Sequence, residues 1–589
     1  VNGAVLAGDF DTFDVERIEV LRGPQGTLYG ANSLGGVLKY VTAKPSTEAF
    51  SAKVRGGVES VDGGETGYSG AGVVNVPVSD KLAVRASGFY REVPGFIDSV
   101  GDNGSDIAED INGTVSSGGR LSALYQPTDT FSIRLSALTQ TLDTDDANEV
   151  DVDAETLELI GDGPQYSRFA AAGREIDYEL YNGTVEWDLG AASLTSSTSY
   201  GTLEQALHND IFSYAYGGLV SAILMTPPVD IVIDQNTDNE KFTQEVRLAG
   251  SNGFDWLVGG YYTEEEGSHA QTVTAVLDGT VEDAGIPTLI DVLLESEYKE
   301  MAAFANTTFY LGDRFDLTVG GRYSHNEQSA DQVTDGLPGL FVAGLEELPT
   351  AESDENVFTY SIAPRYELSD QVTAYARIAK GYRPGGPNAL PPAAPPETPR
   401  TYSSDTSVNY EAGIKAELGD FSFDAALFHI DWEDIQLVAL VGDFGVNTNG
   451  GSAQSTGAEF SANWTPVDGL SLSANGAYTD TELTEDTDQL AVGGDDGDNL
   501  PYVPELTLSL VGDYQWTLFD NVPAFIGGAF RYQSEMGASY ISEPVEAALG
   551  ITRRELPAYE TLDLRAGLLF DDFTVELFAR NVTNEEGLT

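Results

Sequence analysis

Two stretches of the sequence concentrate carboxylate side chains, residues 143–153 and 480–498. Carboxylate oxygens are the ligands that hard divalent cations prefer, so both stretches are candidates for cation capture. Neither has the spacing and the central glycine of an EF-hand calcium loop. The competing interpretation is a solvated acidic surface suited to high salt. The sequence favours this second interpretation, because the whole chain carries 95 acidic and 29 basic residues and a formal net charge of −66.

The composition and the motifs argue against several other kinds of site. A nucleic-acid partner is not expected, because phosphate binding needs basic patches. The chain has no cysteine, so it forms neither disulfides nor thiolate metal sites. We find no G-x-S-x-G elbow, phosphate-binding loop or H-E-x-x-H pair, which argues against an enzyme, and no cofactor is expected. Of the four scattered histidines, His269 and His325 near expected loop bases remain candidates for substrate binding.

The elements that would position a site follow from a repeated module. From residue 51 onward, two runs of about ten to fifteen residues with alternating apolar side chains are joined by a short polar turn. A much longer acidic or glycine-rich stretch precedes the next pair. Short turns at one end and long loops at the other are typical of a bacterial outer-membrane β-barrel. The turns lie at residues 78–81, 126–129, 188–191, 251–254, 311–314, 368–371, 418–421, 466–469, 518–521 and 570–573.

The alternation within each run predicts strands with one face in lipid and the other in a wet lumen. After the turn at 311–314, one face carries Phe315, Leu317, Val319, Gly321 and Tyr323. The other face is polar and includes an aspartate and an arginine, as it is on strand after strand. The sequence has no apolar run long enough for a membrane-spanning helix, so a spanning sheet must close on itself.

The strand count predicts the size of the barrel. One strand near residues 51–61 and two for each turn give about 21 strands, whereas a single bacterial chain normally forms an even number. The predicted fold is therefore all-β, a transmembrane antiparallel β-barrel of 22 strands whose last strand is absent from this sequence. A barrel this wide leaks unless its lumen is filled. We expect the C-terminal part of a plug domain over residues 1–48 and the barrel over residues 49–589.

The segment expected to fill the barrel has a distinctive sequence. VERIEVLRGPQGTLYG at 15–30 is followed by ANSLGGVLKYVTAKP at 31–45, which predicts a strand, a glycine-proline turn, a compact bend and a second strand. This stretch closely resembles the end of the plug domain of TonB-dependent outer-membrane receptors. Further segments resemble the barrel of that family, namely FTQEVRL at 242–248, AKGYRPGG at 379–386, YEAGIK at 410–415, STGAEF at 455–460, LPYVP at 500–504 and LFARNVT at 577–583.

The resemblance implies active transport across the outer membrane of a Gram-negative bacterium. In that family the substrate binds to the extracellular loops and the plug apex, and the TonB protein, driven by the inner-membrane proton gradient, rearranges the plug. TonB, outer-membrane lipids and lipopolysaccharide are therefore expected partners, although the TonB box is not in this sequence. A plug that must move should be held by polar contacts, which water replaces easily.

The resemblance also implies which charges join the plug to the barrel. In family members, plug arginines pair with two wall glutamates from the YE-x-G-x-K and G-x-E strands. The matching glutamates are Glu411 and Glu459, and Arg22 of the RGP turn is the first expected partner, with Arg17 the second. The alternative is that these charges simply face lumen water.

A ferric siderophore, carried as an iron chelate, is the first expected substrate. Tyr29 and Asn32 on the plug bend are candidate contacts. Tyr382 and Arg383 could contact an anionic or catecholate ligand by stacking and charge, or could simply form an ordered loop base.

Other substrates remain open. An acidic mouth slows the arrival of anions, which keeps oligosaccharides, cobalamin and aromatic compounds as alternatives. Haem is less expected, because the FRAP and NPNL signatures of haem receptors are not found. A passive porin or a surface adhesin is the rival of another class, and the plug-like segment argues against a porin.

Overall fold

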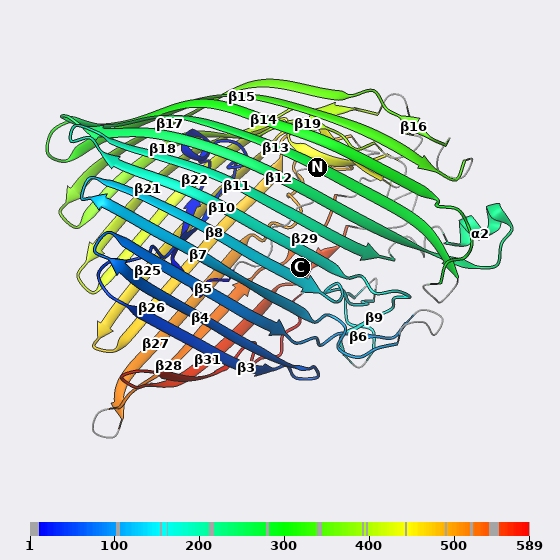
Figure 1. Ribbon diagram of the computed structural model, residues 1–589, viewed down its shortest axis with the longest axis horizontal. Helices are drawn as coiled ribbons and strands as arrows, with labels where there is room; N and C mark the ends of the chain where they lie inside the picture. Colours follow the sequence, from blue (N-terminus) through cyan, green and yellow to red (C-terminus); the bar gives the residue numbers. More distant parts are fainter. Residues whose placement is uncertain are drawn as a thin grey trace.

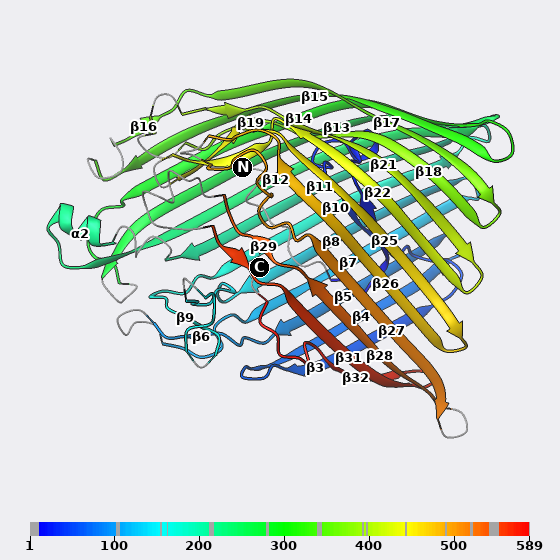
Figure 2. The same ribbon diagram turned by 180° about the vertical axis from the view of Figure 1, so that it is seen from behind.

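The computed structural model shows one β-barrel with a small domain inside it (Figures 1 and 2). The long loops gather at the end of the barrel where α2 lies, and the short turns gather at the opposite end. No described helix is long and apolar enough to cross a bilayer. The structure describes residues 11–101, 107–153, 156–161, 163–210, 217–277, 282–338, 344–390, 394–395, 398–441, 444–488, 492–518, 522–540 and 553–587.

Each barrel strand pairs antiparallel with the next one along the chain, as hairpins with short turns require. In the described part of the chain, the barrel has twenty-one strands of six residues or more, which confirms the count from the turns. They are β3 (Ser51–Ser60), β4 (Thr66–Ser79), β5 (Leu82–Val93), β7 (Thr114–Thr128), β8 (Phe131–Thr144), β10 (Arg174–Asp188), β11 (Ser193–Asn209), β12 (Val229–Ser251), β13 (Phe254–Leu277), β14 (Ile290–Tyr310), β15 (Phe315–Gly336), β17 (Ala351–Ser369), β18 (Val372–Arg383), β21 (Asp405–Leu418), β22 (Phe421–Glu433), β25 (Ala453–Val467), β26 (Leu470–Leu483), β27 (Leu506–Leu518), β28 (Val522–Gln533), β31 (Tyr559–Leu569) and β32 (Thr574–Ala579).

Short elements order the long loops. The helix α2 (Gly218–Leu224) packs Val220 into an apolar cluster with Ile231 and Leu289, which lie at the loop ends of the barrel wall. The remaining loop strands are β6 (Asp98–Ser99), β9 (Gln165–Tyr166), β16 (Glu346–Glu347), β19 (Gly386–Pro387), β20 (Thr401–Tyr402), β23 (Gln436–Val441), β24 (Phe444–Asn449), β29 (Met536–Gly537) and β30 (Glu555–Leu556).

The N-terminal domain is a hairpin with a compact bend. β1 (Val15–Arg22) pairs antiparallel with β2 (Gly36–Thr42), and the short helix α1 (Gly26–Tyr29) lies between them. This order of elements confirms the strand, turn, bend and strand read from the sequence. In both ribbon views the dark-blue hairpin lies within the barrel (Figures 1 and 2), so it occupies the lumen as expected.

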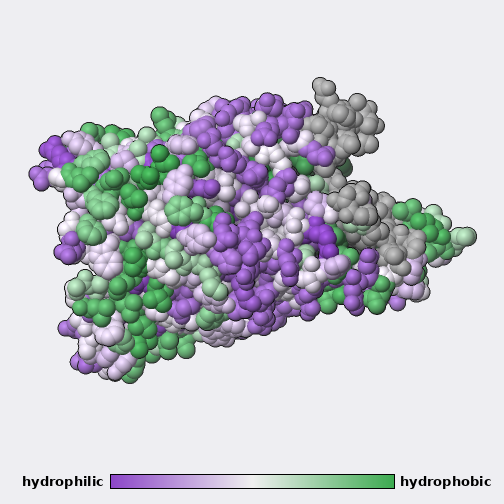
Figure 3. Space-filling view, turned by 90° about the horizontal axis from the view of Figure 1, so that it is seen from above, coloured by the Kyte–Doolittle hydropathy of each residue, from purple (hydrophilic) through white to green (hydrophobic). Residues whose placement is uncertain are grey.

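The two faces of the barrel strands differ as the alternation predicted. On β15, Val319 and Tyr323 are 38% and 53% exposed, whereas Arg322 and Ser324 are buried on the lumen side. On the outer face, tyrosines donate hydrogen bonds to neighbouring carboxylates, for example Tyr262 to Glu264 at 2.9 Å. Figure 3 shows many apolar residues towards the short-turn end and hydrophilic ones across the middle of the face in view, with a further apolar patch at the protruding loop tip. An outer apolar band flanked by aromatic residues is the surface that a membrane-spanning barrel needs.

The outer band gives a direct test of orientation. Leu135 is 59% exposed on the outer face of β8, and Ser132 on the same strand faces the lumen, where its hydroxyl bonds Glu186. Leu135→Arg should lower the free energy of unfolding by up to about 4 kcal/mol, because a guanidinium near the middle of a bilayer is costly. Urea unfolding in lipid vesicles, followed by tryptophan fluorescence, measures this loss.

The matched control is Ser132→Arg, which adds the same charge to the lumen side beside the carboxylate of Glu186. This variant should stay within about 0.5 kcal/mol of the unchanged protein, because the new charge remains in water. Equal losses in the two variants would contradict the assignment of the faces.

Candidate functional site

The plug bend sits against one wall of the barrel at close range. A Cβ on Gly26 would lie 3.0 Å from the carbonyl oxygen of Lys380, and one on Gly30 would lie 2.7 Å from the guanidinium of Arg322. Gly30 also has φ +76°, which other residues rarely adopt. Both the positive φ and the close approach of Arg322 require glycine at Gly30. The backbone of the bend therefore lies directly against strands β15, β17 and β18 of the barrel wall.

Arg322 is the buried charge beneath the bend. Its side chain is 2% exposed and its Nη2 lies 2.6 Å from Oε1 of Glu300, whose side chain is 3% exposed. Ser324 also donates to Glu300, and the guanidinium lies 4.9 Å from the centre of the Tyr261 ring. A buried ion pair is tolerated only when its remaining groups are hydrogen-bonded, and this one meets that condition. The neighbouring rings and the Ser324 hydroxyl thus fix the position of the Arg322 guanidinium against which Gly30 packs.

The RGP turn contacts the next part of the wall. Nη1 of Arg22 lies 3.1 Å from Oε2 of Glu459, while Arg377 donates to the carbonyl oxygen of Pro24 at 2.6 Å. Glu411 is engaged elsewhere, because it accepts hydrogen bonds from Tyr375 at 2.7 Å and from Asn409 at 3.3 Å. The structure therefore brings Arg22 to Glu459 and not to Glu411.

The expectation for Arg17 is wrong. Its guanidinium pairs with Glu16 at 2.8 Å and with Glu19 at 2.6 Å, both inside the plug. Glu19 follows by two residues on the same strand, so its side chain lies on the same face and reaches Arg17 more easily than a wall residue does.

A second ion cluster joins the plug to the opposite region of the barrel. Asp14 precedes β1, and its carboxylate accepts hydrogen bonds from Arg85 of β5 at 2.5 Å and from Arg120 of β7. Arg120 also donates to the carbonyl oxygen of Ala43 at 3.0 Å. Burial raises the pKa of Asp14, but the hydrogen bonds and charges of the two arginines outweigh it, so the pKa lies below the ordinary value. Lys44 lies 3.7 Å from Glu186 and adds a weaker contact.

Sequence reasoning missed Arg322, Arg377 and the cluster around Asp14. The alternation already placed Arg322 on the lumen face, and the same test applied to Arg85 and Arg120 would have placed them there too. Nothing local in the sequence shows which lumen-facing arginine the plug reaches, because those contacts depend on how the hairpin lies in the barrel.

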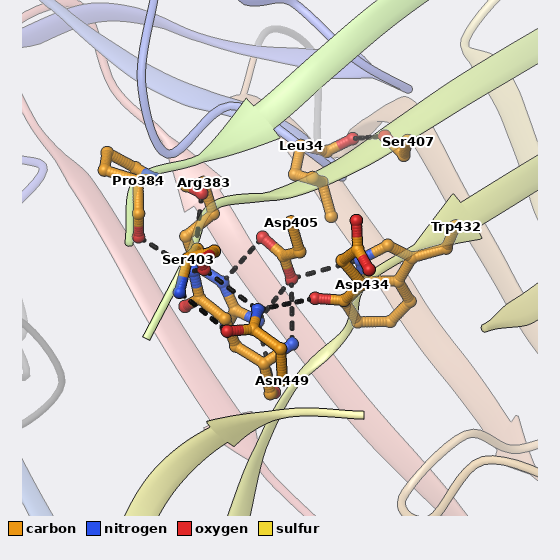
Figure 4. Close-up of polar contacts among 10 residues, drawn as sticks. Leu34, Arg383, Pro384, Ser403, Asp405, Ser407, Trp432, Asp434 and Asn449 are labelled. Carbon is orange, nitrogen blue, oxygen red and sulfur yellow. Dashed lines mark hydrogen bonds and ion pairs between the residues drawn. The ribbon is translucent and has the colours of Figure 1, made fainter. Parts of the chain in front are cut away.

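The base of the loop after β18 is fixed by a buried carboxylate (Figure 4). Asp405 is fully buried and accepts from Nη2 of Arg383 at 2.6 Å. The indole nitrogen of Trp432 donates to the same oxygen at 3.1 Å, and the backbone nitrogen of Gln436 lies 3.4 Å away. Arg383 is thus engaged in holding the loop base, which is the alternative interpretation of this residue.

The substrate candidates fall into two groups. Tyr29 is 41% exposed on the plug bend, and Asn32 lies exposed beside it. Tyr382, in contrast, is fully buried and accepts a hydrogen bond from Asn326 at 3.3 Å, so the expectation that it stacks on a ligand is wrong for this conformation. His269 faces the lumen and bonds Thr237 at 2.8 Å.

His325 lies on the outer face of β15, two residues from the exposed Tyr323. Its Nε2 lies 3.1 Å from Glu327 and its Nδ1 lies 3.8 Å from Asp354. The expectation that it binds substrate is wrong, because an outward side chain cannot meet a ligand in the lumen. Strand parity was the missed signal, since His325 continues the apolar row of Val319 and Tyr323.

The acidic stretches are partly structural. Asp146 is buried and accepts from the backbone nitrogen of Ala172 at 3.2 Å, which ties two parts of one loop together. Among the described residues, the groups with metal-ligand spacing lie on barrel strands, namely His325 with Glu327 and Asp354, and Glu264 with Glu266 and Glu297. Cation capture by residues 143–153 or 480–498 therefore has no support in the described residues.

Comparison with known proteins decides the family. Residues 138–584 match the family described as TonB dependent receptor-like, beta-barrel, and residues 1–37 match the TonB-dependent receptor plug domain. The chain belongs to the TonB-dependent receptor family. Receptors of this family are β-barrels of the Gram-negative outer membrane, which explains the outer apolar band.

Named relatives agree with the family. The pesticin receptor of Yersinia enterocolitica is 27% identical over 501 residues, which cover 83% of this chain and 66% of that protein. The chain thus spans just under two thirds of the length of this receptor. The metal-pseudopaline receptor of Pseudomonas aeruginosa is 28% identical over 220 residues, 37% of this chain and 28% of that protein.

Solved structures share the fold of this receptor. The ferric yersiniabactin uptake receptor of Yersinia pestis superposes with a TM-score of 0.78 at 20% identity, over 97% of this chain and 80% of that one. The closed form of the ferric-catecholate import receptor of Escherichia coli K12 gives 0.72 at 16% identity, over 98% and 83%. At these identities the likeness establishes the fold alone.

The Asp14 cluster predicts that the docking of the plug depends on pH. Because the pKa of Asp14 is lower in the docked plug than in a released one, its stabilising contribution is complete above the ordinary value of 3.8 and is lost as the pH falls through the lowered value. Amide hydrogen exchange of β1, corrected for the intrinsic exchange rate, should show protection lost as the medium is acidified below 3.8.

Two variants separate this effect from general acid unfolding. Asp14→Asn should show weak protection at every pH, whereas Glu16→Gln, which is exposed and pairs with Arg17 of the plug, should behave like the unchanged protein. Protection that survives acidification in the unchanged protein would contradict the assigned role.

The Arg22–Glu459 pair can be tested by a double-mutant cycle. Arg22→Ala and Glu459→Ala should be coupled by up to about 1 kcal/mol in the opening free energy of β1, since the arginine is 43% exposed and water weakens the pair. The matched cycle with Glu411→Ala should show no coupling, because Glu411 bonds Tyr375 and Asn409. A larger coupling to Glu411 would reverse the assignment.

Proposed function

We propose that this receptor imports a ferric siderophore across the outer membrane, and that the TonB protein supplies the energy. The observation that carries the proposal is a plug seated inside the barrel by ion pairs and hydrogen bonds, with the Arg22–Glu459 pair and the Asp14 cluster as its main charged links. Water can replace such contacts one by one as the plug moves, whereas a dry apolar seam would resist displacement.

The relatives support an iron chelate as the substrate. Two of the structural neighbours are named for uptake of ferric yersiniabactin and of ferric catecholates. The exposed Tyr29 and Asn32 on the bend are the proposed substrate contacts, together with the lumen-facing His269. Transport of this kind needs no bond-making step, so the proposal includes no catalysis and no cofactor.

Other interpretations are weaker. Oligosaccharides, cobalamin and aromatic compounds remain alternative substrates for the same transport mechanism. A passive porin is disfavoured because the hairpin with β1 and β2 occupies the lumen. Lipopolysaccharide and the other outer-membrane lipids are the proposed surroundings of the outer band.

Uptake of radioactive iron tests the proposal. The full-length receptor, produced in an iron-starved host without its own siderophore receptors, should accumulate ⁵⁵Fe from a supplied ferric siderophore. Deleting TonB or collapsing the proton gradient should abolish accumulation while surface binding remains, because binding needs no energy but plug movement does. Uptake that continues without TonB in proportion to external concentration would instead indicate a passive pore.

A further inference from the structure

The connections at the loop end of the barrel contain very few cations. Ten segments join successive barrel strands there, from residues 61–65 to residues 534–558, and together they hold thirty-five acidic residues. Their basic residues are Arg168, Arg400, Arg553 and Arg554. Every lysine, arginine and histidine of the chain lies among the described residues.

Three of these four arginines are already engaged. Arg168 is 5% exposed and paired with the buried Asp146. Arg400 donates to the carbonyl oxygen of Pro349. Arg553 donates to the carbonyl oxygen of Asn499 at 2.8 Å, with Asp498 at 3.5 Å. Arg554 is exposed, and it is the one of the four whose side chain has no ion-pair or hydrogen-bond partner among the described residues.

Two cations of the wall below the loops are paired in the same way. Arg383 is paired with the buried Asp405 at 2.6 Å, and Lys241 lies 3.1 Å from Glu265. The plug bend from Gly26 to Gly35 carries no charged residue, so it offers a substrate hydroxyl, amide and backbone groups only. An anionic ligand would therefore meet thirty-five acidic residues against four arginines in the loops, and then a bend that carries no positive charge.

Resting on the proposed function, we propose that the chelate this receptor accepts carries no net negative charge, so that it is a neutral or cationic ferric complex. An opening lined by acidic loops focuses their electric field, which lowers the local concentration and the association rate of an anionic ligand. The same field raises both quantities for a cationic ligand, by about tenfold to a thousandfold at low salt. A plug bend without charged residues suits such a complex, because it neither repels a cationic ligand nor attracts an anionic one. Most of the selection by charge then occurs in the loops.

A matched series of chelates tests the inference. The probes are a linear ferric tris-hydroxamate with a free terminal amine, its N-acetyl derivative and its N-succinyl derivative, which share one iron core and carry net charges of about +1, 0 and −1 near pH 7. A second series with the same three termini on a ferric phenolate core removes dependence on core chemistry. Association with the full-length receptor in detergent is measured at low salt and at 1 M salt.

In each series that binds, the amine form should associate about tenfold or more faster than the succinyl form at low salt. The difference should shrink at 1 M salt, where charges are screened beyond about 3 Å. Fastest association by the succinyl form would overturn the inference while leaving iron import intact. Absence of binding by every probe in both series would overturn the proposed function itself and the inference with it.

Paired protein variants give the matched control. Asp495 and Asp496 are exposed in the loop 484–505, whereas Asp80 and Asp129 are exposed at short turns on the other end. D495N/D496N should slow the amine form and speed the succinyl form, while D80N/D129N, with the same change in net charge, should alter neither rate. Equal effects of the two pairs would contradict selection at the loops.

Discussion

A backbone amide or carbonyl in hydrocarbon must be hydrogen-bonded within the protein, and the rest of this structure follows from that constraint. Strands can satisfy it only by pairing with neighbours on both sides around a closed sheet. The closed sheet here has twenty-one strands of six residues or more in the described part of the chain. A cylinder of that width has a lumen too large for side chains to fill, so a separate segment must occupy it.

The segment in the lumen is held by two kinds of contact. At the bend, Gly26 and Gly30 bring backbone against the wall, and the buried pair of Arg322 and Glu300 forms a rigid floor under Gly30. Elsewhere, charges connect the hairpin to the wall, with Arg22 half-exposed and Asp14 largely buried. The contacts at the bend depend on shape, whereas those of Arg22 and Asp14 depend on charge. Salt and acid should therefore weaken the charged contacts more than the contacts at the bend.

The turns, the faces of the strands and the presence of the plug could be read from the sequence, because each depends on residues close together in the chain. The pairing partners could not. Asp14 and Arg85 are far apart in sequence, and their meeting depends on the angle at which the hairpin lies. The same holds for Arg22, where family resemblance named two glutamates and the geometry reaches only Glu459. Tyr382 was misjudged for the same reason: β18 separates from β17 after Ala379 while it stays paired with β21, and the side chain of Tyr382 is buried where it meets Asn326 of β15, far away in the sequence.

The Asp14 cluster and the contacts of the bend lie almost half a circumference apart. Asp14 is grasped by β5 and β7, the third and fourth barrel strands, and the bend rests on β15, β17 and β18, the eleventh to thirteenth. The hairpin therefore links two nearly opposite sides of the barrel wall across the lumen, as a cross-brace does. A wide, thin-walled tube in a membrane under lateral pressure tends to become oval, and a brace fastened at both ends resists that flattening. Releasing one end would let the cross-section relax as well as clear a way through.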